Sequence, residues 1–239
     1  MDIKTYSRKY SHFYGDPLPP LLAKYIRRSQ PGQRIMDVGC GDGRILHTLQ
    51  AQGLLEGLGV TAVDLSPDRI QTVAQLNPNF RCVVAGACDL MGIADQSVDF
   101  VISTQVIEHV SQDKQMIREI CRVLAPGGLA YVTTVFKKRW AWYWHRCNGK
   151  WVLDPTHVRE YMSDSQLLGA MTGCGLAVLE SKKQPLAYPL IDPFLRLAKV
   201  SRDVLLSSRL LRALRRIKLP ILGYYNWEVV VQKPLPAGR

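Results

Sequence analysis

The fold is decided by the stretch Arg34-Ile-Met-Asp-Val-Gly-Cys-Gly-Asp-Gly-Arg-Ile-Leu-His-Thr-Leu49. It opens with a short apolar run typical of a buried strand, continues with Gly39, Gly41 and Gly43 at alternate positions, and passes into apolar residues at helical spacing from Ile45. Glycines between a strand and a helix let the backbone take positive φ. They also let a ligand lie against main-chain N–H groups at the positive end of the helix. The stretch predicts a strand, a tight turn and a helix that together bind a small polar ligand.

Two details favour a ligand site over a glycine-rich turn that binds nothing. The spacing is GxGxG preceded by Asp37, and it differs from the GxGxxG that seats a pyrophosphate in dinucleotide-binding proteins. The next apolar run, residues 58–63, ends at Asp64. That position puts a carboxylate at the tip of a second strand, where it can accept hydrogen bonds from ribose hydroxyls.

Length and composition indicate one folded domain of medium size. The chain has 239 residues, of which 47% are hydrophobic, enough for a sizeable core. Six cysteines, at 40, 82, 88, 121, 147 and 174, lack paired CxxC spacing, which argues against a zinc site and against a disulfide scaffold. The first ten residues lack the apolar core of a secretion signal, and no apolar run reaches spanning length. We expect a reduced, cytoplasmic protein.

Strand and helix patterns alternate along the chain, which predicts an α/β fold with a parallel sheet and right-handed crossovers. In such sheets the ligand lies beyond the carboxyl ends of the strands. The expected strands are residues 35–38, 57–64, 80–85, 98–103, 129–135, 176–182 and 226–234. The expected helices are residues 21–28, 45–52, 67–76, 113–124 and 163–172.

Four motifs in order carry a resemblance to a known family. Asp37-Val-Gly-Cys-Gly-Asp-Gly43 followed by Val63-Asp64-Leu-Ser resembles the class I S-adenosylmethionine-dependent methyltransferases. Val98-Asp-Phe-Val-Ile-Ser-Thr-Gln-Val-Ile-Glu-His109 and Val123-Leu-Ala-Pro-Gly-Gly-Leu129 are similar to that family's fourth-strand motif and fifth-strand entry. The ordered motifs cover about residues 33–135. The resemblance implies a doubly wound, Rossmann-like, mostly parallel seven-stranded sheet whose last strand is antiparallel.

The same resemblance implies S-adenosylmethionine as cofactor, and no metal is expected. One position departs from the family: Ala87 stands where many relatives carry an adenine-binding aspartate, so the adenine amino group is assigned to Asp89 from a shifted loop or to the backbone alone. The residues that the resemblance places at the cofactor are Asp37, Gly39, Cys40 and Gly41 around the methionine and sulfonium part, Asp64 at the ribose, Leu65 over the adenine, and Cys88, Asp89 and Gln105 nearby.

An aromatic and cationic loop follows the fifth strand. It reads Phe136-Lys-Lys-Arg-Trp-Ala-Trp-Tyr-Trp-His-Arg-Cys-Asn-Gly-Lys-Trp151. Such side chains can stack on nucleic-acid bases, sugar faces or a quinone ring, can lie at a membrane interface, or can simply cover the end of the sheet. Because the family places its acceptor here, the predicted substrate residues are Trp140, Tyr143 and Trp144, with Tyr14 from the N-terminal segment.

Two histidines are candidate general bases, because imidazole titrates near neutrality. His157 lies in Asp154-Pro-Thr-His-Val-Arg-Glu-Tyr161, which resembles a His-x-x-x-(Tyr/Phe) entry that many members carry after strand five. His109 ends the fourth-strand motif. A structural role is the alternative for each.

Two segments flank the single methyltransferase domain expected over residues 1–239. Residues 1–30 carry tyrosines at helical spacing and serve either as an active-site lid or as an aromatic cover for the core edge. Residues 184–225 are expected to be a basic amphipathic helical insertion before the last strand. Between Phe194 and Leu219 there are eight basic residues and one acid, so this stretch carries 8 − 1 = +7 and the rest of the chain 11 − 7 = +4. Such a helix can dock on an anionic membrane, pack as a lid, or contact RNA.

The sequence therefore favours an S-adenosylmethionine-dependent methyltransferase, with O-methylation of a small or lipid-linked acceptor such as a glycan or quinone precursor. Its expected location is the cytoplasm, with possible peripheral contact with an anionic membrane through residues 194–219. An RNA methyltransferase is one alternative, and it loses ground because no separate RNA-binding module flanks the core. A cofactor-binding or membrane-docking protein without transfer activity is the other, which Ala87 favours and the intact Asp37, glycines and Asp64 oppose.

Overall fold

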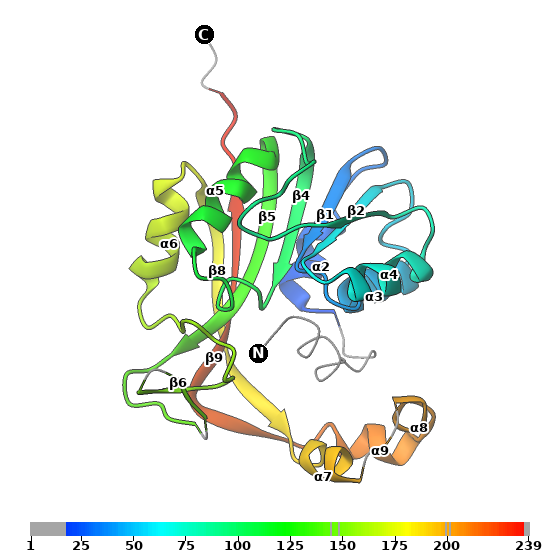
Figure 1. The fold of residues 1–239 in the computed structure, drawn as a ribbon, viewed down its shortest axis with the longest axis vertical. Helices are drawn as coiled ribbons and strands as arrows, with labels where there is room; N and C mark the ends of the chain where they lie inside the picture. The colour runs from blue at the N-terminus through cyan, green and yellow to red at the C-terminus, as the bar shows by residue number, and fades with distance from the viewer. Residues whose placement is uncertain (1–17, 144, 148, 199, 201, 237–239) are drawn as a thin grey trace.

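Seven strands form one sheet in the order β3-β2-β1-β4-β5-β9-β8 (Figure 1). The computed structural model describes residues 18–236 except 144, 148, 199 and 201. β1 to β5 run parallel, and β9 is antiparallel to both of its neighbours. This confirms the predicted doubly wound sheet with an antiparallel last strand. The strands are β1 (Arg34–Val38), β2 (Gly59–Asp64), β3 (Arg81–Val84), β4 (Val98–Thr104), β5 (Leu124–Lys137), β8 (Ala177–Pro189) and β9 (Lys218–Gln232).

Helices cover both faces of the sheet and define two cores. Neighbouring strand residues point to opposite faces, so Ile35 packs with α2, α3 and α4 while Met36 packs with α5 and α6. Buried apolar runs on both faces are expected of parallel strands covered by helices on each side. These helices are α2 (Pro20–Ile26), α3 (Arg44–Ala51), α4 (Pro67–Leu76), α5 (Asp113–Val123) and α6 (Asp164–Gly173).

Local sequence accounts for the boundaries of these helices. α4 begins at Pro67, where a missing N–H costs least, and the Ser66 side chain accepts the N–H of Arg69 at its start. A capping box between Ser163 and Gln166 starts α6. The predicted helix at residues 67–76 matches α4 at both ends.

β5 begins earlier than the expected residue 129. Leu124 already pairs with Val98, and a register shift then brings Leu129 opposite Phe100. The Pro126-Gly-Gly stretch that precedes the expected strand thus forms an irregularity inside β5, with Gly127 at φ 78°.

The insertion before β9 projects from the sheet (Figure 1). β8 and β9 continue as a two-stranded ribbon in which Ala187 pairs with Pro220 and Pro189 with Lys218. The ribbon takes up both ends of the segment 184–225, so the helical part of this segment is shorter than expected and consists of short helices. Ser208 caps the last of them. These helices are α7 (Asp192–Leu197), α8 (Arg202–Ser207) and α9 (Arg209–Leu214).

The aromatic loop after β5 contains a short hairpin that the sequence did not indicate. β6 (His145–Cys147) pairs antiparallel with β7 (Lys150–Val152) around Gly149, whose φ is 76°. β8 runs in the same direction as β5, because both are antiparallel to β9. The hairpin and the helical insertion therefore both leave the carboxyl-end edge of the sheet, where the ligand of such a fold binds.

Candidate active site

The glycine loop, residues 39–43 between β1 and α3, is held in place by the neighbouring strand β2. The N–H groups of Gly39 and Cys40 donate to the Val63 carbonyl at 2.7 and 3.0 Å. Gly39 has φ 73°, and a Cβ at this position would lie 2.4 Å from Cγ2 of Val106. Only glycine suits this position, because any other residue would have a strained backbone at this positive φ and a Cβ that collides with Val106. Val106 follows β4, so this close approach joins the glycine loop to the loop after β4.

Asp64 organises the glycine loop from the end of β2. Its Oδ2 accepts the N–H of Gly41 at 2.9 Å, and its Oδ1 accepts the N–H of Ser66 at 2.8 Å. Each carboxylate oxygen has a second lone pair. The same side chain can therefore hold the loop and also accept a hydrogen bond from a hydroxyl group of a ligand.

Asp37 is the most unusual charged group of this loop. Its side chain is buried, and neither carboxylate oxygen has a hydrogen-bond partner among the described residues. Burial, and next the charge of Asp64, raises the pKa of Asp37 to about 7. A buried carboxylate without a partner costs free energy, which a cationic ligand would offset.

The remaining predicted cofactor residues lie around this loop. Leu65 is 57% exposed, and its Cδ1 is 3.9 Å from the Cβ position of Gly86. Asp89 is an exposed turn residue whose N–H donates to the Gly86 carbonyl at 3.0 Å. Leu65 and the 86–89 turn thus lie side by side, and their contact with an adenine stays a prediction.

Three other predicted cofactor residues have partners within the protein. Cys40 is buried, and burial raises the pKa of its thiol, so it packs rather than reacts. The Cys88 thiol donates to the Gln112 carbonyl at 3.4 Å. Gln105, at φ 55°, donates from Nε2 to Asn226 Oδ1 at 3.0 Å and so ties the end of β4 to β9.

The structure brings the two predicted catalytic histidines together. The ring centroids of His109 and His157 lie 4.8 Å apart, edge to face. His157 is buried, and its Nδ1 lies 2.9 Å from Oε1 of Glu160. Burial, and next the charge of His157, lowers the pKa of His109 to about 4, so His109 is neutral at pH 7.

Sequence reasoning missed three charged residues beside these histidines. Glu108 is buried, and burial raises its pKa to about 7. Oε2 of Glu160 lies 3.3 Å from Nζ of Lys137 at the end of β5. Glu108 and Glu160 stand in the motifs that the histidines drew attention to, one before His109 and three after His157. Their spacing to a histidine was the available signal.

Val106 joins the histidine pair to the glycine loop, because it lies against Gly39 and its carbonyl accepts the N–H of His109 at 2.9 Å. Arg69 lies beside the same loop, with its Nη1 3.8 Å from the Cβ position of Gly41. The region around Asp37 and Asp64 and the histidine pair are thus neighbouring parts of one edge.

The predicted substrate residues are only partly described. Tyr14 and Trp144 lie outside the described residues. Trp140 is 66% exposed, with its ring atom Cζ3 3.0 Å from the Cβ position of Gly223, and the ring of Tyr143 lies 6.2 Å from that of Tyr224. Both contacts are with β9, where its pairing with β5 ends. Their substrate role stays a prediction.

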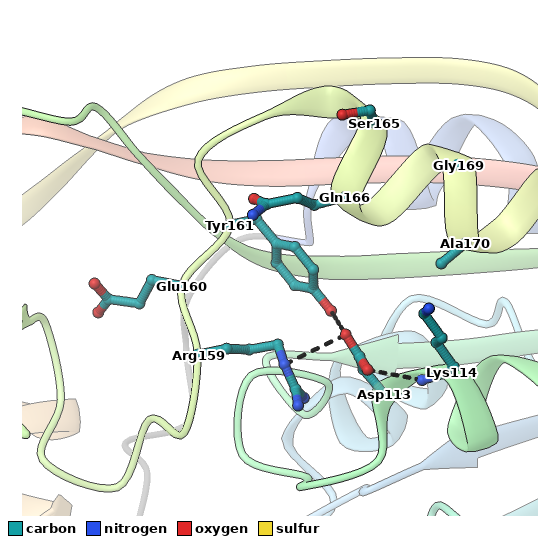
Figure 2. A pocket seen from close by; sticks show the side chains of 9 residues that line it. All are labelled: Asp113, Lys114, Arg159, Glu160, Tyr161, Ser165, Gln166, Gly169 and Ala170. Atoms are coloured by element: carbon teal, nitrogen blue, oxygen red, sulfur yellow. Dashed lines mark hydrogen bonds and ion pairs between the residues drawn. The ribbon is translucent and has the colours of Figure 1, made fainter. Parts of the chain in front are cut away.

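An open groove of about 610 Å³ lies between α5 and α6 (Figure 2). Asp113, which lines the groove, accepts a hydrogen bond from the Tyr161 hydroxyl at 3.0 Å and lies 3.3 Å from Nε of Arg159. Glu160 borders the groove, but Figure 2 shows its carboxylate turned away from the other side chains. The lining residues include none from the glycine loop, so the groove is separate from the region around Asp37 and Asp64.

Comparison with known proteins places this geometry in a family. Residues 36–132 match the family model described as a methyltransferase domain. The biotin biosynthesis bifunctional protein BioHC of Cellvibrio japonicus is 28% identical over 68% of this chain and 32% of its own length. The human mitochondrial ubiquinone biosynthesis O-methyltransferase is 33% identical over 48% of this chain and 34% of its own length. The chain thus spans about a third of each of these two relatives.

A solved structure extends the similarity to nearly the whole chain. The [4+2]-cyclase SpnF has a TM-score of 0.66 at 21% identity, over 91% of this chain and 80% of that one. At this identity the likeness shows the fold alone, and a cyclase on this fold illustrates that the fold does not determine the activity. The matched domain over residues 36–132, the ordered motifs and the sheet order identify a methyltransferase domain of the class I S-adenosylmethionine-dependent type, which has a Rossmann-like fold and uses S-adenosylmethionine.

Proposed function

We propose that this protein transfers the methyl group of S-adenosylmethionine to an oxygen atom of a small or lipid-linked acceptor. The observation that carries the proposal is Asp37, a buried carboxylate whose two oxygens lack hydrogen-bond partners among the described residues. S-adenosylmethionine carries an ammonium and a sulfonium group, so its methionine end supplies the positive charge that this carboxylate needs.

The residues around the glycine loop fit this cofactor. Asp37, Gly39 and Gly41 would face its methionine part, Asp64 its ribose, and Leu65 its adenine. The cofactor supplies a methyl group already activated by the positive sulfur. The protein then contributes mainly by positioning the acceptor oxygen in line with the methyl carbon.

The acceptor site is proposed at His109 and His157. The pair is joined to the glycine loop through Val106. Relatives named for ubiquinone and biotin biosynthesis support a small-molecule acceptor. The O-methyltransferase among them supports oxygen as the methylated atom.

Transfer of label from methyl-tritiated S-adenosylmethionine tests this activity. The protein is incubated with a total lipid extract, with a water-soluble metabolite extract, or with total RNA. We expect label in lipid or metabolite products, and its loss on Asp37→Asn. Label confined to RNA would overturn the acceptor class, and a folded protein that labels no fraction would contradict the transferase proposal.

The insertion supports peripheral contact with an anionic membrane. Arg209, Arg212 and Arg216 line a shallow hollow of about 260 Å³ on α9. Phe194 and Leu210 nearby in the insertion are 71% and 68% exposed. Exposed apolar side chains beside arginines are the combination that binds a membrane surface, with each cation near it worth about 1 kcal/mol. No helix among the described residues is long and apolar enough to cross a membrane.

Liposome co-sedimentation tests the membrane contact. We expect the protein to sediment with vesicles containing phosphatidylserine at low salt, and the triple change of Arg209, Arg212 and Arg216 to glutamate to abolish it. Changing the exposed Arg27, Arg28 and Arg118 to glutamate alters net charge equally and is the matched control. Equal sedimentation with neutral and anionic vesicles would remove the membrane proposal.

A further inference from the structure

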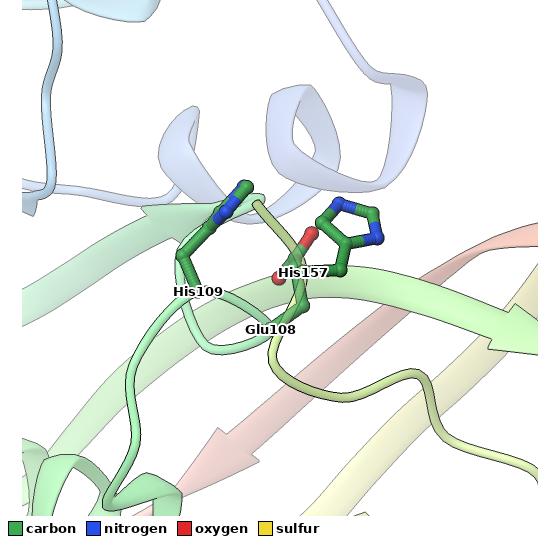
Figure 3. A group of neighbouring side chains, drawn as sticks. All are labelled: Glu108, His109 and His157. Atoms are coloured by element: carbon green, nitrogen blue, oxygen red, sulfur yellow. The ribbon is translucent and has the colours of Figure 1, made fainter. Parts of the chain in front are cut away.

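Three side chains that can bind a metal converge at the edge of the sheet (Figure 3). Glu108 and His109 follow β4, and His157 lies on the loop between β7 and α6. One potential ligand atom from each lies within 4.8 Å of the other two, and no other such group occurs among the described residues. Figure 3 shows the Glu108 carboxylate between the two imidazole rings.

Oxygen acceptors hold both imidazole rings by the same nitrogen. Nδ1 of His157 lies 2.9 Å from Oε1 of Glu160. Nδ1 of His109 lies 3.1 Å from the Thr156 hydroxyl, which itself donates to Asp154 Oδ1 at 2.6 Å and therefore accepts from the histidine. A proton fixed on Nδ1 leaves the lone pair on Nε2. This is the tautomer that histidine metal ligands adopt when a neighbouring acceptor orients them.

Glu108 supplies an unsatisfied oxygen at the centre of the group. Its side chain is completely buried, and its Oε2 accepts from the Thr134 hydroxyl at 2.9 Å. Its Oε1 is buried without a hydrogen-bond partner among the described residues. An orphaned carboxylate oxygen is costly in the interior, and a bound cation would satisfy it.

We propose that Glu108, His109 and His157 bind a divalent first-row transition-metal ion through one carboxylate oxygen and the two Nε2 atoms. Two imidazoles and one carboxylate suit zinc, manganese or iron better than magnesium, which prefers oxygen ligands. Three protein ligands leave coordination positions open for an exchangeable group. Glu160 and Thr156 are positioning residues that orient the rings.

The role of the ion rests on the proposed function. The group lies next to the glycine loop, so an acceptor hydroxyl bound to the ion would lie near the cofactor. The ion would lower the pKa of that hydroxyl, whose proton leaves to solvent. The oxygen then forms a bond to the methyl carbon as the carbon–sulfur bond breaks, and the electron pair of that bond neutralises the sulfonium. In this account the histidines bind the ion and neither takes the proton.

Metal titration of the full chain tests the site without any turnover. The protein is stripped with EDTA and desalted, then titrated with MnCl₂ while free Mn²⁺ is followed by electron paramagnetic resonance, and with CoCl₂ while visible absorption is recorded. We expect one ion per chain and cobalt d–d bands typical of nitrogen and oxygen ligands. Glu108→Gln and His157→Asn should each weaken Mn²⁺ binding by more than about tenfold, and Glu160→Gln by about tenfold.

Controls separate this site from surface binding and from misfolding. His47→Asn removes an exposed imidazole on α3 and should leave binding unchanged. Circular dichroism identifies any variant that fails to fold, and His157→Asn, at a loop, remains informative if Glu108→Gln does not. Absence of stoichiometric binding to the wild type, or binding unchanged in the folded variants, would overturn the metal site. S-adenosylmethionine binding to the stripped protein, measured separately, shows whether the proposed function fails instead.

Discussion

Replacing Asp37 by asparagine should stabilise the free protein and weaken cofactor binding. Burial raises the pKa of Asp37 from 3.8 to about 7, so the folded state holds a proton that the unfolded state has released. Between these values the free energy of unfolding of the wild type falls as pH rises, because the folded state binds more protons. Asparagine has no such dependence. The advantage of Asp37→Asn should therefore grow by roughly 3 kcal/mol between pH 5 and pH 8, at about 1.4 kcal/mol per pKa unit.

Urea unfolding of both proteins at pH 5 and pH 8 measures this difference through the transition midpoint and slope. Asp89→Asn, which changes an exposed carboxylate beside the same loop, is the matched control and should show no comparable trend. At pH 8 the Asp37→Asn protein should bind S-adenosylmethionine more weakly than the wild type. A stability difference that stays constant from pH 5 to pH 8, or cofactor affinity equal to that of the wild type, would refute the reasoning.

Three further predictions concern the loop, the histidine pair and the insertion. Gly39→Ala should lower the free energy of unfolding by about 1–3 kcal/mol, since its Cβ would lie 2.4 Å from a valine methyl carbon at φ 73°; Gly32→Ala, with φ 87° and nothing within 4 Å, isolates the strain alone. In the wild type the free energy of unfolding should rise by roughly 3 kcal/mol between pH 4 and pH 6.5, because in this range the unfolded state binds more protons at His109 than the folded state does. His109→Gln should remove this rise, as measured by urea unfolding midpoints across the same pH range. Asp192→Asn should loosen the insertion by breaking the two-bond contact with Arg215 at 2.8 and 3.1 Å, seen as faster proteolysis there while the global midpoint stays within about 1 kcal/mol.

The sheet was predictable because its signals are local. The strands expected from residues 35 and 98 and the helix at residues 67–76 follow from apolar periodicity and from Pro67 after Ser66, and the structure begins the first strand one residue earlier, at Arg34. The ribbon beyond the sheet was not predictable in this way. Pro185, Pro189 and Pro220 interrupt the alternation of a strand. Pro185 and Pro189 nevertheless lie on the edge strand β8, and Pro220 lies on β9 beyond its pairing with β5, which are places where a sheet tolerates a missing N–H.

The glycine loop and Asp64 were predictable as a pair, because strand ends of a parallel sheet meet at one edge. The proximity of His109 to His157 was not, since it depends on a loop that folds back from beyond β7. Glu108 and Glu160 were missed for the same reason. Glu108 matters because it is buried with one oxygen that lacks a hydrogen-bond partner among the described residues, and Glu160 because it contacts both His157 and Lys137; neither property is visible in the sequence.

Calorimetric titration of S-adenosylmethionine into the full chain at pH 8 tests the central claim most directly. We predict one cofactor molecule bound per chain, and binding weakened strongly in Asp64→Ala, which removes the acceptor for the Gly41 and Ser66 N–H groups. A well-folded wild type that binds neither S-adenosylmethionine nor S-adenosylhomocysteine would contradict the account.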